Sequence, residues 1–230
     1  MDRNSNAPRN EGRGSRVFVI VVLALLAALI LAALVVPFAV YRSRGEVIAS
    51  YGQVTVRRDL YVYWLSEYKW LYLRTAAKSD PTAEDSPAFW NSEIEEGVTR
   101  ADQARAEADA WIKNIVFAAS CFEEVEDARL GARTVEAMEK AYDNLLQYEL
   151  NTEKKYNAAA KKIGFTYATV RRALLFETEG EAYVGGADDS DLDAFFALAE
   201  REVTFRSAAD RIDFVSLSID SRLYLTQQTN

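Results

Sequence analysis

The chain has 230 residues, a formal net charge of −8, one Cys and no His. The acidic excess falls in residues 45–230, because residues 1–44 contain six Arg and only two acidic residues. A nucleic-acid partner is therefore not expected, because proteins bind phosphates through basic surfaces. The absence of His removes Ser–His and Cys–His catalytic pairs and the commonest zinc ligand.

Residues 17–41 form an apolar run without a single charged side chain. A bilayer core about 30 Å thick needs ~20 apolar helical residues, and a backbone in lipid must form hydrogen bonds with itself. The run exceeds the roughly 7–15 residues of a signal-peptide core. We therefore expect an uncleaved transmembrane signal anchor over residues 17–41, with a buried helix of a soluble domain as the alternative.

The charges beside this run predict its orientation. Four Arg precede it within the polar residues 1–16, whereas Arg42 and Arg44 follow it closely. Under the positive-inside rule, residues 1–16 are predicted to be a cytoplasmic tail. The larger C-terminal part is predicted to lie outside the cytoplasmic membrane.

The segment after the anchor predicts a small β element followed by an aromatic helix. Residues 46–56 are rich in Val, Ile and Thr and have Gly52 at a turn position, which predicts two short strands. Asp59 is a candidate cap for a helix from Leu60 to about Arg74. One broad face of this helix is predicted to be core: Leu60, Tyr61, Trp64, Leu65, Tyr68, Leu71 and Tyr72.

Two large aromatic residues fall on the opposite face of that helix, beside Asp59 and Glu67. Tyr63 and Trp70 are seven residues apart and have no evident core partner on a helical wheel. They are interpreted as a contact patch, with the alternative that the predicted helix from Thr99 or the one from Thr134 covers them. The predicted peptide-binding residues are Tyr63, Trp70, Tyr72, Phe89 and Trp90.

The remaining pattern is mostly helical. A loop is predicted over residues 80–87, and the chain from residue 220 is predicted to be flexible. Apolar residues at spacings of three and four, among them Trp111, Ile115 and Ala118, predict a long helix from Thr99 to about Glu126. Further helices are predicted over residues 134–163, 166–183 and 192–203, and a strand over 211–219 that pairs with residues 47–56.

Three features with possible chemistry are assigned structural roles. Asp189, Asp191 and Asp193 have the spacing of a calcium loop, but Ala194 occupies the position that needs Gly, so a helix N-terminus is predicted instead. The Glu clusters near residues 93–96 and 123–127 are predicted to be solvated. Cys121 is predicted to be a small buried hydrophobe. With no nucleotide-binding or redox motif, neither a cofactor nor an enzymatic activity is expected.

The order of these elements resembles the N-terminal chaperone module of the SurA and PrsA foldases. The resemblance covers residues 46–219 and rests on the strand–turn–strand around Gly52, the aromatic helix, and the Phe89-Trp90 element before Gly97. Tyr51 stands where the family usually has Asn. The prolyl isomerase domain that often follows in the family has no counterpart here, and its site relies on His.

The resemblance implies a mostly α fold with a small β element, and a non-enzymatic, ATP-independent module that binds unfolded or extended polypeptides. From the sequence we therefore expect a membrane-anchored chaperone-like protein whose partners are secreted or unfolded chains and the lipid bilayer. The alternative is a structural or scaffolding domain that binds one specific partner in an envelope complex.

Overall fold

The computed structural model describes residues 45–125, 129–185 and 189–224. The contacts divide the chain into two units, residues 1–43 and residues 44–230. The predicted tail and the predicted transmembrane helix over residues 17–41 lie outside the described residues. None of the described helices is both long enough and apolar enough to span a bilayer.

The predicted mostly helical fold with a small β element is confirmed in the described part of the chain. The strands β1 (Val47–Tyr51) and β2 (Val54–Arg57) form an antiparallel hairpin, as the sequence predicts. Gly52 turns the hairpin with a φ of 50°, and a Cβ atom there would collide with the Ser120 side chain. Only Gly fits a turn that lies this close to another helix.

Helix α2 (Arg58–Ser79) follows the hairpin directly and is longer than predicted. Asp59 does not cap it. Its buried carboxylate instead accepts hydrogen bonds from Thr169 Oγ1 at 2.9 Å and Arg172 Nη2 at 3.2 Å, and so connects α2 to a later helix. Both faces of the first three turns of α2 are buried, including Ser66, Glu67 and Lys69. The N-terminal half of this helix therefore lies in the core, whereas the half from Leu71 to Ser79 is partly exposed.

A short helix and a second hairpin connect α2 to the longest helix. Ser86 caps α3 (Pro87–Trp90), and β3 (Glu93–Glu95) pairs with β4 (Val98–Thr99). The sequence predicts neither strand of this hairpin, whose glutamates are solvated as expected. Helix α4 (Arg100–Glu124) begins at a capping box formed by Thr99 and Asp102, close to the predicted boundary.

The chain after α4 forms two helices where one was predicted. Helix α5 (Ala132–Leu145) ends at Leu146, and a 3₁₀ turn, η1 (Tyr148–Leu150), precedes α6 (Glu153–Ile163). The break allows Leu150 to enter the core, and Thr152 caps the new helix by accepting a hydrogen bond from Lys155 N. The prediction of a single helix over residues 134–163 is therefore wrong, because the chain forms two helices there.

Helices α7 (Tyr167–Val184) and α8 (Asp189–Glu202) agree with their predictions, and Thr166 caps α7. The passage from Val203 to the 3₁₀ turn η2 (Ser221–Leu223) contains no strand, so the predicted strand over residues 211–219 is wrong. Only one backbone hydrogen bond joins this passage to β1, from Arg206 N to Ile48 O at 2.7 Å.

Two cationic side chains bind the carbonyl groups of the C-terminal passage in place of a paired strand. Arg105 donates to Ile212 O and Ala209 O, at 2.8 and 3.0 Å. The buried Lys69 ammonium donates to Val215 O and Leu217 O, at 3.0 and 2.7 Å. Because these donors satisfy the carbonyl groups, the passage can pack against the core without forming a sheet.

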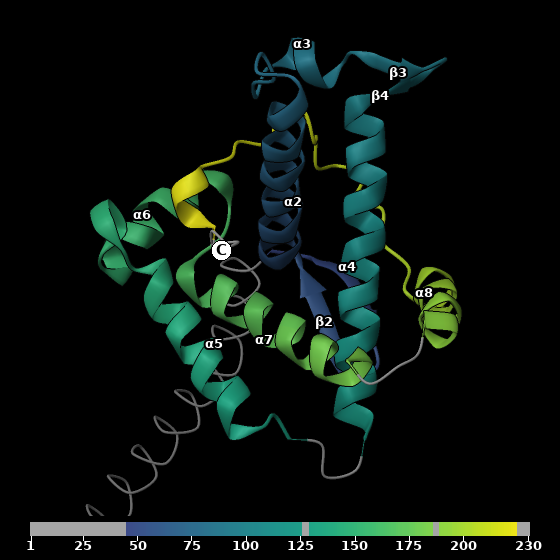
Figure 1. Cartoon of the computed structure of the whole chain (residues 1–230), viewed down its shortest axis with the longest axis vertical. Coiled ribbons are helices and arrows are strands. Elements are labelled where there is room, and N and C mark those ends of the chain that lie inside the picture. Colours follow the sequence, from purple (N-terminus) through teal and green to yellow (C-terminus); the bar gives the residue numbers. More distant parts are fainter. Residues whose placement is uncertain (1–44, 126–128, 186–188, 225–230) are drawn as a thin grey trace, which may run out of the picture. The chain divides into compact units, whose positions relative to one another are not determined.

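Helices α2 and α4 lie side by side, and α7 crosses them near the hairpin (Figure 1). Helix α8 packs against α4, and α5 and α6 pack against α7 (Figure 1). The space where α2, α4, α7 and α8 meet contains the candidate site.

Candidate functional site

The two aromatic residues predicted to form a contact patch belong to the core. Tyr63 is fully buried, with its ring centroid 5.2 Å from that of Phe165, and Trp70 is 9% exposed and stacks on Tyr224 at 5.4 Å. The ring contacts come from Phe165, in the α6–α7 connection, and from Tyr224, after η2, and Tyr156 of α6 also lies near Tyr63. Neither residue offers an open surface to a ligand.

The other predicted binding residues cluster around Trp90, whose ring lies beside the buried ammonium of Lys69. Trp90 is fully buried, and its indole donates to Asp85 Oδ1 at 2.7 Å. Lys69 Nζ lies 5.1 Å from the Trp90 ring centroid and pairs with the same Asp85 oxygen at 2.8 Å. Tyr72 and Phe89 pack on Trp90 and are half-buried. These residues form part of the structural core.

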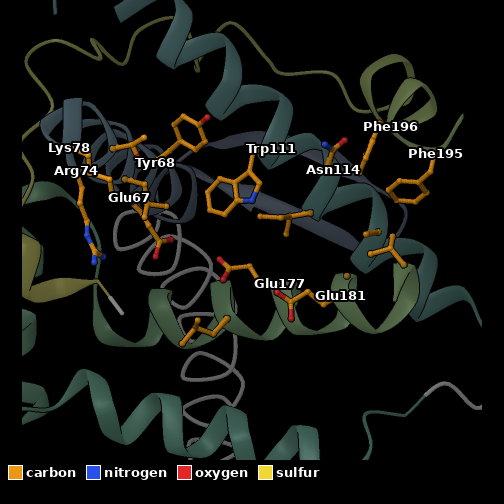
Figure 2. Close-up of a pocket in the computed structure, with 17 residues that line it drawn as sticks. Glu67, Tyr68, Arg74, Lys78, Trp111, Asn114, Glu177, Glu181, Phe195 and Phe196 are labelled. Carbon is orange, nitrogen blue, oxygen red and sulfur yellow. The ribbon is translucent and has the colours of Figure 1, made fainter. Parts of the chain in front are cut away.

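A cavity of about 650 Å³ opens between α2, α4, α7 and α8 (Figure 2). Its walls are largely apolar, and Trp111 of α4 projects into the middle of the close-up, with Phe195 and Phe196 of α8 at one side. Tyr68 packs against Trp111, with ring centroids 5.9 Å apart. A pocket of this size and composition is typical of sites that bind organic ligands or side chains.

Large hydrophobic residues at this cavity remain in contact with solvent. Leu71 is 39% exposed and Phe196 is 43% exposed, and both line the cavity. Phe195 is partly buried and packs edge-on against Phe117, with ring centroids 4.9 Å apart. The apolar surface therefore continues from the cavity wall to its rim, and a ligand that covered it would remove this surface from water.

Two carboxyl groups lie on facing walls of the cavity. Glu67 extends from α2 toward α7, and Glu177 extends from α7 toward α2 (Figure 2). The indole N–H of Trp64 donates a hydrogen bond to Glu177 Oε1. Glu67 Oε2 is buried and has no hydrogen-bond partner, although the Tyr63 hydroxyl is near enough to lower its pKa.

The surroundings raise the pKa of both groups. Burial raises the pKa of Glu67 well above its ordinary value, and the charge of Glu177 adds to this effect. Burial raises the pKa of Glu177 to about 7, opposed by the Trp64 hydrogen bond and reinforced by Glu181. Glu177 faces the cavity and is half-buried by surface area, so its environment changes when the cavity is occupied. Glu177 therefore titrates near neutral pH, whereas burial favours the protonated form of Glu67.

Sequence reasoning found one wall of this site and missed the rest. Trp111, Ile115 and Ala118 belong to the stripe predicted as core, and all three line the cavity. Glu67 was placed with the polar face, and nothing in the sequence singled out Glu177. Contacts between residues more than 100 positions apart, such as that of Trp64 with Glu177, pair α2 with α7 and bring the two glutamates together.

Two other sequence features have ordinary positions. Cys121 is half-buried against the core. Within the described residues no group of acidic, Cys or His side chains could hold a metal ion. Asp191 and Asp193 are exposed on α8, which is helical from Asp189, as the helix prediction requires.

Comparison with known proteins gave no relative. The chain matches no family model, no curated protein and no solved structure.

Proposed function

We propose that this protein is a membrane-anchored, ATP-independent chaperone-like module that binds extended polypeptide segments in the cavity between α2, α4, α7 and α8. The observation that carries the proposal is the apolar surface that runs from Trp111 inside the cavity to the exposed Leu71 and Phe196 at its rim. Such a surface binds through burial of apolar area, which favours hydrophobic side chains without requiring one sequence.

The size of the cavity is consistent with a ligand that is a short segment of a polypeptide chain. A volume of about 650 Å³ accommodates a few side chains. Burying one Leu- or Phe-sized side chain contributes roughly 1.5–3 kcal/mol. Contacts with two or three such side chains, less the cost of ordering the segment, give the weak and reversible binding that suits a chaperone.

The predicted helix over residues 17–41 places this module at the membrane. With residues 1–16 in the cytoplasm, the cavity faces the outer side of the cytoplasmic membrane, where polypeptides emerge unfolded. This topology and the resemblance to the SurA and PrsA chaperone module support the same function.

The test uses the full-length protein in lipid nanodiscs and an unrelated protein that aggregates on dilution from denaturant. The wild type should suppress the aggregation, and the double variant Leu71→Ser/Phe196→Ser should lose most of this effect, because both changes remove apolar surface at the rim. The matched control is Val135→Ser/Tyr148→Ser, which removes exposed apolar side chains from α5 and η1, away from the cavity.

Equal protection by the rim variant and the wild type would contradict the proposed site. If the wild type protects no unrelated protein but retains one partner in a pull-down, and the rim variant loses that partner, the protein is a dedicated scaffold.

A further inference from the structure

Glu67 and Glu177 form a pair of facing carboxyl groups inside the cavity, at the contact between α2 and α7. Glu67 is more than nine-tenths buried, and its Oε2 atom has no hydrogen-bond partner. Glu177 Oε1 accepts the Trp64 indole N–H. A buried acceptor without a donor costs free energy. A hydrogen-bond donor or a positive charge placed beside Glu67 Oε2 would therefore be stabilising.

Among the described residues, no cation supplies this positive charge. Across the described residues, neither carboxyl group takes part in an ion pair. The basic residues that line the cavity are Arg74 and Lys78, both exposed. The Arg74 guanidinium lies 5.5 Å from the Trp70 ring centroid and interacts with that ring. The pair can therefore retain a proton, or it can ionise when a ligand brings a cation.

We propose that the cavity selects polypeptide segments in which a basic side chain, Lys or Arg, is flanked by apolar residues, and that the cation binds between Glu67 and Glu177. This selectivity rests on the proposed function, because it names the segments that the same cavity prefers. The basic side chain donates to the unpartnered Glu67 Oε2, and its apolar neighbours cover Trp111, Leu71 and Phe196. The combination matches the two chemistries of the cavity, an acidic pair within apolar walls.

Binding of the cation is coupled to proton release, because a protonated carboxyl pair does not attract it. The charged groups that line the cavity are Glu67, Arg74 and Lys78 of α2 and Glu177 and Glu181 of α7. The residues of α4 and α8 that line it are uncharged. Three tyrosines also border Glu67, and burial raises their pKa so that they remain neutral: Tyr63, Tyr156 and Tyr224. Affinity for a basic segment should therefore rise between pH 5.5 and pH 8.

The experiment measures binding of three acetylated, amidated apolar peptides to the full-length protein in nanodiscs. The peptides differ only in the central residue, which is Lys, norleucine or Glu. Norleucine keeps the aliphatic stem of Lys and removes the charge, so the comparison isolates the cation. At pH 8 the Lys peptide should bind at least about tenfold more tightly than the norleucine peptide, and the Glu peptide most weakly. The preference for Lys should shrink at pH 5.5.

The variant Glu67→Gln/Glu177→Gln should bind the Lys and norleucine peptides with affinities within about twofold of each other. The control Glu136→Gln/Glu139→Gln removes the same two charges from the exposed surface of α5 and should keep the full preference for Lys. If the cavity variant does not fold, the wild-type comparison between Lys and norleucine at the two pH values decides alone.

The outcomes separate this inference from the function on which it rests. Failure of all three peptides to bind would contradict the polypeptide-binding function itself. Equal binding of the Lys and norleucine peptides to the wild type would contradict the cation selectivity and leave the apolar binding intact. A Lys preference that survives loss of both carboxyl groups would also overturn the inference.

Discussion

Trp64 on α2 donates its indole N–H to the carboxylate of Glu177 on α7, and this hydrogen bond joins two helices at the cavity. Trp64 itself is fully buried, so its position is fixed by the core. The bond therefore holds a titratable group at a defined place in an apolar wall. Stability and proton binding are therefore coupled at this point.

The raised pKa values of three glutamates, two of them in the cavity and Glu179 beside it on α7, predict that the protein loses stability as the pH rises. An acid whose pKa is raised by folding favours the folded state while it is protonated. This stabilisation is lost as the pH rises from the pKa of the group in the unfolded chain to its pKa in the folded protein. The pKa of Glu177 is raised to about 7, that of Glu179 to about 7, and that of Glu67 is raised well above its ordinary value. The wild type should therefore be more stable at pH 5 than at pH 8.

Denaturant titration of the full-length protein at the two pH values measures this difference. Glu177→Gln should reduce it by on the order of 1–3 kcal/mol. Four aspartates have a lowered pKa, and the stability that they contribute is lost only when the pH falls below the range compared here, so it is nearly the same at pH 5 and pH 8: Asp80, Asp102, Asp213 and Asp220. Greater stability at pH 8 than at pH 5 would contradict the assignment of the raised pKa values.

Truncation of the two aromatic residues once expected to form a contact patch should destabilise the fold. Tyr63→Ala and Trp70→Ala each remove a large side chain from a packed site and should cost about 3–5 kcal/mol. The exposed Tyr148 is the control, and Tyr148→Ala should change the free energy of unfolding by less than about 0.5 kcal/mol. A melting temperature unchanged in either core variant would show that the residue does not pack as described.

Lys69 should be required to hold the C-terminal passage. Lys69→Met keeps much of the side-chain volume but removes the donor of the Val215 and Leu217 carbonyl groups and the cation that pairs with Asp85. Asp85 is partly exposed, so the cost comes mainly from the carbonyl groups that lose their buried donor and should be at least about 1–3 kcal/mol. Hydrogen exchange should be faster across residues 206–224, whereas Lys140→Met, which breaks an exposed pair on α5, should leave exchange there unchanged.

The protein should not catalyse prolyl isomerisation. In the family that the sequence was expected to resemble, the prolyl isomerase site relies on His, and this sequence contains none. Uncatalysed isomerisation takes tens to hundreds of seconds, so catalysis is readily detected with a proline-containing peptide. A rate that increases in proportion to protein concentration would refute this expectation.

The anchor prediction is tested by membrane extraction. A helix over residues 17–41 should keep the full-length protein in the membrane fraction after washing with alkaline carbonate. Deletion of residues 1–41 should release the remainder. Recovery of a natural soluble form that starts near Tyr41 would show that the segment is cleaved.

Elements with local signals could be predicted from the sequence. Thr99 and Thr166 supply caps and are followed by residues at helical spacing, so the starts of α4 and α7 were placed within a residue or two. The break at Leu146 was missed because residues on both sides of it favour helix. It depends on Leu150 reaching a core that the local sequence does not describe.

The misassigned strand and most of the site depend on contacts distant in sequence. Alternating apolar residues favoured a strand over 211–219, but Lys69 and Arg105, each more than 100 residues earlier, bind its carbonyl groups instead. Glu67 follows the polar side of a helical wheel, and the wheel cannot show that α7 covers that side. The stripe through Trp111 correctly predicted an apolar face of α4. Residue spacing cannot show whether such a face packs against the core or lines an open cavity.

Site-specific photo-crosslinking tests the polypeptide-binding cavity most directly. A photoreactive phenylalanine analogue is placed at Phe196, on the rim, or at Val135, on α5, in the full-length protein in nanodiscs, and the protein is illuminated with an unfolded client. Both positions are exposed to a similar extent, at 43% and 38%. Strong crosslinking at position 196 with little at position 135 is the predicted result. Equal crosslinking at both positions, or crosslinking at position 135 alone, would contradict binding in this cavity.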